Sequence, residues 1–266
     1  MFCFQCQETA KGTGCVLKGV CGKSAFTARN MDLLLFVVRG IAVAADNLRQ
    51  HNVDPGKETD TFVTDALFST ITNANFDDES IMRRIDRGLE MRDALKARAE
   101  AEGIALPGAD ELEWTGTRAD YDAKAATVGV LREENEDLRS LKELVMYGLK
   151  GMAAYLEHAM RLGYDDAEIH AFMQNALALT TVGNLTADEL TALVMKTGEV
   201  GVRTMALLDK ANTATYGNPE ATNVNIGVRN RPGILISGHD LHDLEELLEQ
   251  TKDTGIDIYT HGEMLP

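Results

Sequence analysis

The sequence predicts a mainly α-helical protein, in which N-terminal helical bundles are followed by the start of a parallel α/β domain. Two observations support this fold class. From about residue 30 to residue 210, apolar residues recur at steps of three and four, which is typical of the buried face of a helix. After Thr213, turn sequences rich in Gly, Asn and Pro are followed by two short apolar runs with an amphipathic stretch between them. We therefore predict two domains, residues 1–216 and residues 217–266.

The first domain is expected to begin with an aperiodic segment of about 23 residues and to continue as a series of helices. Asn75 and Asp77 resemble a capped helix start, and Thr186 with Glu189 forms a capping box that opens the last helix. The expected helical ranges are 30–50, 60–72, 81–101, 135–161, 165–179 and 187–210. Together they are long enough for two packed bundles.

The second domain is predicted to contain one strand–helix–strand unit. The apolar runs 233–237 and 256–260 read as strands, the first of them buried, and residues 240–252 form an amphipathic helix. The residues expected to face inward from that helix are Leu241, Leu244, Leu247 and Leu248. Two parallel strands and one helix cannot cover both faces of a sheet, so we expect the remaining C-terminal half in the same or another chain.

Composition argues against several partners and locations. The 266 residues carry a formal net charge of -16, from 26 basic and 42 acidic side chains, which repels nucleic acid and anionic membrane surfaces. The longest apolar run, Leu33–Val38, is far too short to cross a bilayer, and the N-terminus lacks the pattern of a signal peptide. We therefore expect a cytoplasmic, reducing environment, in which clustered thiols indicate metal or redox chemistry.

Cysteine supplies the strongest functional signal. All 4 cysteines fall in the pattern Cys3-x2-Cys6-x8-Cys15-x5-Cys21, with glycines among them. Four thiolates this close in sequence can surround one centre, and glycines let backbone N–H groups approach inorganic sulfide. Structural zinc usually shows two short cysteine pairs, and only one is present. The spacing therefore favours an iron–sulfur cluster over zinc, with free or disulfide-linked thiols as a third interpretation.

Two further candidate ligands lie at the ends of the predicted strands. His239 follows the first strand and Glu263 follows the second, so both fall on the carboxyl edge of the sheet, where ligands bind. Each can ligate a metal, although a capping or solvated role is the commoner outcome for such residues. His242 and His261 could reach the same edge, and we interpret them as a candidate proton relay or as surface residues.

The segments that carry these residues resemble a known family. The N-terminal segment Met1–Ala10, together with Thr13–Cys15 and Lys18–Lys23, closely resembles the N-terminus of the hybrid-cluster protein (prismane) family. The segments 237–241 and 259–266 resemble two later signatures of that family. The resemblance runs through the whole chain and covers the N-terminal half of a family member.

The resemblance implies a fold, an activity and two cofactors. The family, known as hydroxylamine reductase, reduces hydroxylamine to ammonia and water, and nitric oxide reduction has also been assigned to it. Its fold is a helical domain followed by two Rossmann-like domains. By motif match, Cys3, Cys6, Cys15 and Cys21 bind a 4Fe-4S cluster, which a redox donor protein reduces. His239 and Glu263 match ligands of a hybrid Fe-S-O cluster that binds the small nitrogen substrate.

The chain departs from the family pattern in one respect. The hybrid cluster also needs several cysteines and a further Glu from the C-terminal half, whereas no cysteine follows Cys21 here. We therefore expect the activity of the complete protein and not of these 266 residues alone. Two alternatives remain open: a stand-alone electron-transfer module with a single cluster, and a zinc-stabilised interaction domain that uses the same four thiolates.

Overall fold

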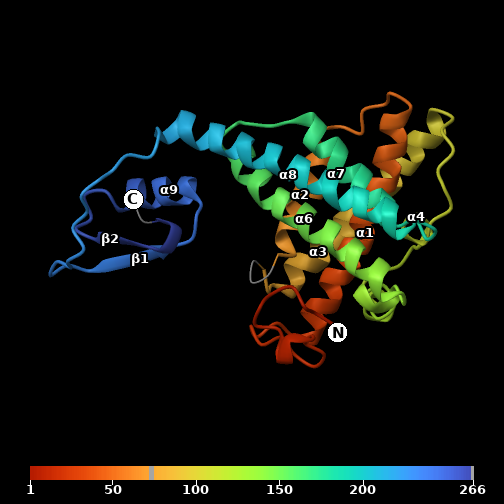
Figure 1. The fold of residues 1–266 in the computed structure, drawn as a ribbon, viewed down its shortest axis with the longest axis horizontal. Helices are drawn as coiled ribbons and strands as arrows, with labels where there is room; N and C mark the ends of the chain where they lie inside the picture. Colours follow the sequence, from red (N-terminus) through yellow and green to blue (C-terminus); the bar gives the residue numbers. More distant parts are fainter. Residues whose placement is uncertain (72–74, 265–266) are drawn as a thin grey trace. The chain divides into compact units, whose positions relative to one another are not determined.

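The computed structural model describes residues 1–71 and 75–264 (Figure 1). Internal packing divides the chain into two units, which are described separately. The helical unit comprises residues 1–157 and 166–204, and the βαβ unit comprises residues 158–165 and 205–266. The mainly α fold class with a small parallel sheet is confirmed. The predicted domain boundary at residue 216 stays a prediction.

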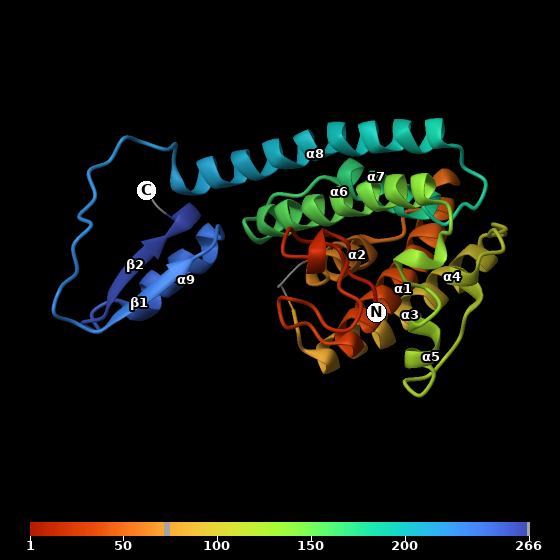
Figure 2. The same ribbon diagram turned by 60° about the horizontal axis from the view of Figure 1, so that its bottom comes forward.

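Helix α1 forms the centre of the helical unit, with neighbouring helices around it (Figures 1 and 2). It extends over Ala25–Gln50, and its apolar face is completely buried, including Leu34 and Phe36. Its neighbours are α2 (Lys57–Ser69), α3 (Asp78–Ala101), α4 (Asp110–Glu113), α5 (Tyr121–Ala125) and α7 (Ala167–Leu179). The predicted ranges 30–50, 81–101 and 165–179 are confirmed to within a few residues. Residue 72, the predicted end of the second helix, lies outside the described residues.

Side chains that satisfy free backbone groups fix the ends of these helices. Ser24 caps α1 by accepting a hydrogen bond from the backbone N–H of Thr27 at 3.0 Å, and Asp77 caps α3 in the same way through Ser80. After α1, Asn52 takes the left-handed conformation (φ 60°) that commonly ends a helix. The caps explain why α1 begins five residues before its clear periodicity.

Helices α6 (Glu136–Arg161) and α8 (Ala187–Tyr216) approach closely where both belong to the helical unit. A Cβ atom added to Gly148 would lie 2.5 Å from the methyl group of Thr197, so a larger residue at position 148 would force this side chain to shift. The predicted capping box is confirmed, because Glu189 accepts from the backbone N–H of Thr186 at 2.8 Å. Helix α8 continues to Tyr216, six residues beyond its predicted end.

The βαβ unit has the predicted order and strand direction. Strand β1 (Gly233–Ser237) pairs in parallel with β2 (Asp257–His261), with Gly233 opposite Asp257 and Ser237 opposite His261. Helix α9 (Leu241–Thr251) connects them and is capped by Asp240, whose carboxylate accepts from two backbone N–H groups of its first turn. Single 3-10 turns at Ala10–Gly12, Val130–Arg132 and Gly262–Met264 complete the elements.

Two predictions about burial in the βαβ unit were wrong. Strand β1 was expected to be buried, but Leu235 is 68% exposed and Ile234 is 38% exposed. Leu248 was expected to face inward and is 50% exposed, whereas Leu241, Leu244 and Leu247 are half-buried. The reason is geometric. In the part of the chain that the structure describes, β1 has one partner strand and one covering helix, which leave much of its apolar surface in solvent.

Candidate metal centre

The N-terminal loop brings Cys3 and Cys15 together. Their backbones form an isolated antiparallel bridge, in which the N–H of Cys3 donates to the carbonyl of Cys15 at 3.1 Å and the N–H of Cys15 donates back at 2.8 Å. The loop between them is held by Thr9, whose hydroxyl and N–H both donate to the carbonyl of Cys6. Two of the four cysteines are thus directly opposite each other, and the carbonyl of Cys6 is held in a turn that Thr9 closes.

Cys21 lies in a separate turn made by glycines. The N–H of Gly19 donates to the carbonyl of Lys23 at 2.8 Å, and the N–H of Gly22 donates to the carbonyl of Gly19 at 2.9 Å. A Cβ atom on Gly19 would lie 3.0 Å from the sulfur of Cys21, and Gly22 has a φ of 97°, which disfavours other residues. The two glycines therefore make room for an exposed thiol at this position.

The thiols differ in environment. Cys15 is buried, Cys3 and Cys6 are half-buried, Cys21 is exposed, and all four are free thiols. The N–H of Ala10 lies 3.5 Å from the sulfur of Cys15, and this bond, with one from Val20, lowers the pKa of that thiol. Across residues 1–71 and 75–264, no three Cys, His, Asp or Glu side chains lie close enough to hold a metal ion together. Ligation of one centre by all four thiols therefore requires the loop to bring their sulfur atoms closer together.

Aromatic and charged side chains anchor the loop on the helices. Phe4 packs on Phe2 and on Tyr147 of α6, with ring centroids 5.5 Å and 5.6 Å apart. The side-chain amide of Gln5 fits between the carbonyl of Thr70 and the ammonium group of Lys150, at 3.2 Å and 3.1 Å, in the orientation that satisfies both. The loop is thus tied to α6 and to the end of α2 directly beside Cys6.

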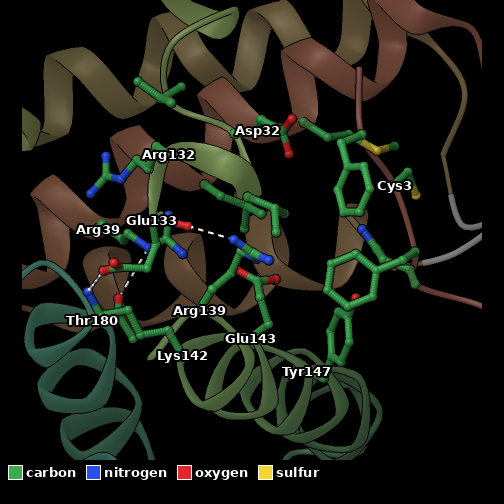
Figure 3. Close-up of a pocket in the computed structure, with 18 of the residues that line it drawn as sticks. Cys3, Asp32, Arg39, Arg132, Glu133, Arg139, Lys142, Glu143, Tyr147 and Thr180 are labelled. Carbon is green, nitrogen blue, oxygen red and sulfur yellow. Dashed lines mark hydrogen bonds and ion pairs between the residues drawn. The ribbon is translucent and has the colours of Figure 1, made fainter. Parts of the chain in front are cut away.

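A polar cavity of about 190 Å³ lies beneath the loop. Figure 3 shows Cys3 and Tyr147 on one side of it and Arg39 and Thr180 on the opposite side. Arg39 donates through Nε to the hydroxyl of Thr180 at 3.1 Å. Asp32 and Glu143 also line the cavity and form no hydrogen bond or ion pair with any residue that the structure describes. Charged groups without protein partners are satisfied by water or by a polar ligand.

Burial perturbs the charged groups around this cavity in opposite directions. It raises the pKa of Asp32 to about 7, with Lys150 and Arg39 opposing the rise and Glu143 adding to it. It lowers the pKa of Lys150 to about 8, and here Glu143 and Asp32 oppose the change. Burial also raises the pKa of Tyr147. The cavity therefore holds an acid and a base that both titrate near neutral pH.

The structure brings His239 and Glu263 together at the carboxyl edge of the sheet. Nδ1 of His239 lies 3.4 Å from a carboxylate oxygen of Glu263, and both side chains are largely exposed. Two ligand atoms about 2.0–2.2 Å from one metal in tetrahedral geometry lie roughly 3.4 Å apart. The pair is thus spaced as two ligands of a single ion would be. Its exposure leaves further coordination positions open.

His158 lies next to this site, although the sequence did not single it out as a candidate. It lies in the last turn of α6, within the βαβ unit, and its Nδ1 is 3.1 Å from the carboxylate of Asp240. Its ring meets that of His239 edge to face, with centroids 5.8 Å apart. Asp240 thus caps α9 with one oxygen and orients His158 with the other, so that His158 supports the ring of His239.

The other two histidines have different surroundings. Nδ1 of His261 lies 3.0 Å from the hydroxyl of Ser237, its partner in the strand register, so it links the carboxyl ends of the two strands. The nitrogens of His242 lie 3.5 Å and 4.0 Å from carboxylates of Glu245 and Glu246 on its own helix. His261 therefore shares the sheet edge with the candidate ligands, whereas the carboxylates near His242 lie on its own helix, α9. The proton-relay role of both stays a prediction.

Sequence reasoning missed the charged residues of the cavity. Glu143, Tyr147 and Lys150 recur at steps of four and three along α6, and Asp32 and Arg39 are seven apart on α1, so each set shares a helix face. Charged residues at such spacing normally indicate a solvated face. Only the packing of the N-terminal loop over these faces reveals that they are enclosed. His158 gave no signal, because its partner Asp240 is 82 positions away.

In the described parts of the chain, no helix is both long enough and apolar enough to span a membrane. The fold and the site define a mainly α class of protein, in which a cysteine-rich N-terminal loop is anchored on helices and a parallel βαβ unit follows. The chain belongs to the Prismane/CO dehydrogenase family, whose profile matches residues 1–266. The resemblance noted in the sequence is thereby confirmed.

Curated relatives agree with this assignment. A hydroxylamine reductase of Bacteroides thetaiotaomicron is 61% identical over 100% of this chain and 48% of its own length. Proteins of the same name from Desulfitobacterium hafniense and Clostridium botulinum are 58% and 52% identical, again over the whole chain. The chain covers 49% and 51% of these two relatives. It therefore spans about half the length of the curated relatives it matches.

Proposed function

We propose that this chain supplies the N-terminal, iron–sulfur half of a hydroxylamine reductase. The observation that carries the proposal is the loop that holds Cys3, Cys6, Cys15 and Cys21 within nineteen residues and is anchored on helices. Relatives named hydroxylamine reductase match the chain throughout, which favours the same activity for the complete protein. Hydroxylamine reduction consumes two electrons and two protons, breaks the N–O bond, and yields ammonia and water.

The donor set of the loop suits a cluster of the 4Fe-4S type. Four thiols are present in the loop, which matches the preference of iron–sulfur clusters for thiolate ligands. The backbone N–H at the sulfur of Cys15 provides the kind of hydrogen bond that tunes cluster potential. The same bond favours the thiolate form, which is the form that binds metal.

His239 and Glu263 would contribute an imidazole and a carboxylate to a second, hybrid Fe-S-O cluster. Borderline and hard ligands of this kind suit iron that is bonded to oxygen as well as sulfur. Because no cysteine follows Cys21, the remaining thiolates must come from protein outside these 266 residues. Bound together, the two clusters would supply the electrons for N–O cleavage to a small nitrogen substrate.

The residues of this chain would act by positioning and by holding protons. Asp240 fixes His158, and His158 in turn limits rotation of the His239 ring, so that one imidazole nitrogen faces Glu263. His261, held by Ser237 at the same edge, is placed to hold a proton next to this pair. On this account His158 is a positioning residue for the second site.

Turnover in a protein of the relatives' full length that contains this chain tests the proposal. The wild type should convert hydroxylamine to ammonia under anaerobic conditions with a reduced viologen as donor. Glu263→Gln removes a ligand and should lower kcat about 100-fold or more, with the iron bound by the N-terminal loop retained. His51→Ala, on the exposed end of α1, is the matched histidine control and should leave kcat unchanged.

Two outcomes would favour the alternatives. A protein that contains one cluster and exchanges electrons, but produces no ammonia at any hydroxylamine concentration, would indicate a single-cluster electron-transfer module. A protein that contains one zinc ion and no sulfide would indicate a zinc-stabilised interaction domain. Unchanged turnover in Glu263→Gln would remove Glu263 from the second site and leave the N-terminal assignment intact.

A further inference from the structure

The N-terminal loop exposes an apolar patch beside the only exposed cysteine. Val16, Leu17 and Val20 are 59%, 85% and 59% exposed, and all three lie between Cys15 and Cys21. Most apolar side chains of α1, by contrast, are completely buried. Exposed apolar residues that are grouped within five positions commonly mark a surface that contacts another molecule. We call Val16, Leu17 and Val20, with the flanking Lys11 and Lys18, the loop patch.

The loop patch is basic in a strongly acidic chain. Residues 1–24 contain three lysines and one glutamate, whereas the other 242 residues contain 23 basic and 41 acidic side chains. Lys11 and Lys18 are exposed, and neither forms a hydrogen bond or an ion pair with any residue in the described ranges. Lys23 differs from them, since it is buried and lies over the ring of Phe76. Two unpaired positive charges therefore flank the apolar side chains.

The charge distribution selects one kind of partner. A basic protein would be attracted to most of the surface of this chain, so it would not be directed to the loop. An acidic protein would be repelled by most of the surface and attracted only at the loop patch, which fixes both where and how it docks. A small apolar centre with a charged rim is also what short-lived redox complexes use, because they must dissociate quickly.

We propose that the loop patch is the docking surface for a small acidic electron-carrier protein. The inference rests on the proposed function, because the carrier would deliver its electron to a cluster held by the thiols of the same loop. One electron leaves the reduced carrier, which becomes oxidised, and the cluster gains that electron. Docking on Leu17 and Val20 places the carrier next to Cys21, so the electron crosses a short distance.

The test is anaerobic stopped-flow reduction of the cluster-loaded protein by a reduced, small acidic ferredoxin. In the double variant Lys11→Glu with Lys18→Glu, the second-order rate at low salt should fall about 10- to 100-fold. The wild-type rate should fall steeply as salt is added, and that dependence should nearly disappear in the variant. Leu17→Ser should weaken binding by about fivefold with the salt dependence kept.

A matched charge reversal elsewhere in the chain distinguishes an effect of the loop patch on the reduction rate from an effect of net charge. Lys196→Glu with Lys252→Glu changes the total charge by the same amount at two exposed lysines outside the loop. This control should change the rate less than about twofold. Carbodiimide cross-linking of ferredoxin to the cluster-free chain, mapped by mass spectrometry, gives a readout without turnover. It should join Lys11 or Lys18 to carboxylates of the ferredoxin.

The outcomes distinguish this inference from the proposed function. If dithionite reduces the cluster in every variant but the loop reversal leaves the ferredoxin rate unchanged, the docking surface is wrong and the cluster assignment stands. If no variant or wild type contains reducible iron, the proposed function itself fails. Lysine labelling that finds Lys11 and Lys18 protected in a protein of the relatives' full length would show that the rest of the protein covers the patch, and would overturn the inference.

Discussion

The helical unit and the βαβ unit differ in how far they bury large apolar side chains. Leu34 and Phe36 of α1 have no exposed surface, whereas Leu235 of β1 is 68% exposed and Ile226, shortly before β1, is 96% exposed. The helical unit surrounds its central helix with other helices and thereby closes its own core. In the βαβ unit the two strands pair in parallel as predicted, but few elements pack against the apolar side chains of β1. Local sequence therefore determines the helices and strands of both units. Burial of their apolar side chains depends on how many other elements pack against them.

The two candidate sites differ in the same way. The thiol loop is built from 21 consecutive residues and anchored by Gln5 and Phe4 on its own unit. His239 and Glu263 follow the ends of two strands, and both side chains are largely exposed. We expect the first site to load metal in this chain alone and the second to require further protein.

The largest expected effect comes from a matched pair of leucine truncations. Leu34→Ala should lower the free energy of unfolding of the helical unit by about 3–5 kcal/mol, because it leaves a cavity in a closed core. Leu235→Ala should change stability by less than about 0.5 kcal/mol, since most of that side chain is already in water. Urea unfolding followed by circular dichroism measures both. Similar losses for the two variants would contradict the contrast in burial.

The next effect is a pH dependence confined to the helical unit. The folded pKa of Asp32, about 7, lies above its ordinary value of 3.8, so the folded protein binds more protons between these values. Stability should therefore fall as pH rises from about 4 to 7 and should not recover above 7 through this group. Asp32→Asn should remove the fall, and the variant should be more stable than wild type at pH 8 by about 2–4 kcal/mol.

The control for this prediction lies in the βαβ unit. Asp243 is 64% exposed and is paired only at 3.8 Å with Arg161, so Asp243→Asn should follow the wild-type pH curve closely. Urea midpoints at pH 4.5, 6 and 8 give the comparison. A wild-type curve that rises between pH 4.5 and 7, relative to Asp32→Asn, would show that Asp32 is ionised and stabilised in the cavity.

A smaller effect concerns close helix packing in the helical unit. A Cβ atom on Gly40 of α1 would lie 2.2 Å from the backbone carbonyl oxygen of Glu111, so Gly40→Ala should cost about 1–3 kcal/mol. Gly198 of α8 has open space at the same position, and Gly198→Ala should add about 0.5–1 kcal/mol through helix propensity. Thermal unfolding of the two variants should shift in opposite directions. A shift in the same direction would contradict the packing at α1.

The smallest effect is expected in the βαβ unit. Asp257 of β2 is 5% exposed, and Arg229 binds both of its carboxylate oxygens, at 2.5 Å and 3.1 Å. Arg229→Ala should cost about 1 kcal/mol, because the exposed rim of this unit lets water replace the guanidinium. Faster hydrogen exchange at β2 amides, with no change in α1, is the expected readout. Substitution of the exposed Arg231 by Ala serves as the control. Equal exchange in both variants would show that the ion pair between Arg229 and Asp257 does not stabilise β2.

Much of this architecture could be predicted from the sequence. Periodicity located the long helices because each buries one face, and Thr186 and Glu189 identified a helix start through their reciprocal capping bonds. The alternation of strand, helix and strand gave the parallel pairing. The sequence also placed His239 and Glu263 at one sheet edge, where the structure has them 3.4 Å apart, and the ligand roles of this pair and of the four cysteines stay a prediction.

What could not be predicted depends on contacts between distant segments. The enclosed charges at Asp32 and Lys150 result from a loop folding over two helix faces, and no local pattern encodes that enclosure. His158 reaches Asp240 for the same reason. The exposure of β1 was missed because an apolar run indicates a strand that can be buried and does not reveal whether covering elements are near.

The central claim is that the first 21 residues hold one iron–sulfur cluster through four thiolates. The most direct measurement is the iron, zinc and acid-labile sulfide content of the anaerobically reconstituted 266-residue chain, compared with its Cys21→Ser variant. The account predicts about four iron and four sulfide per chain, little zinc, and marked loss of iron in the variant. One zinc ion without sulfide, or iron that remains fully bound in Cys21→Ser, would contradict it.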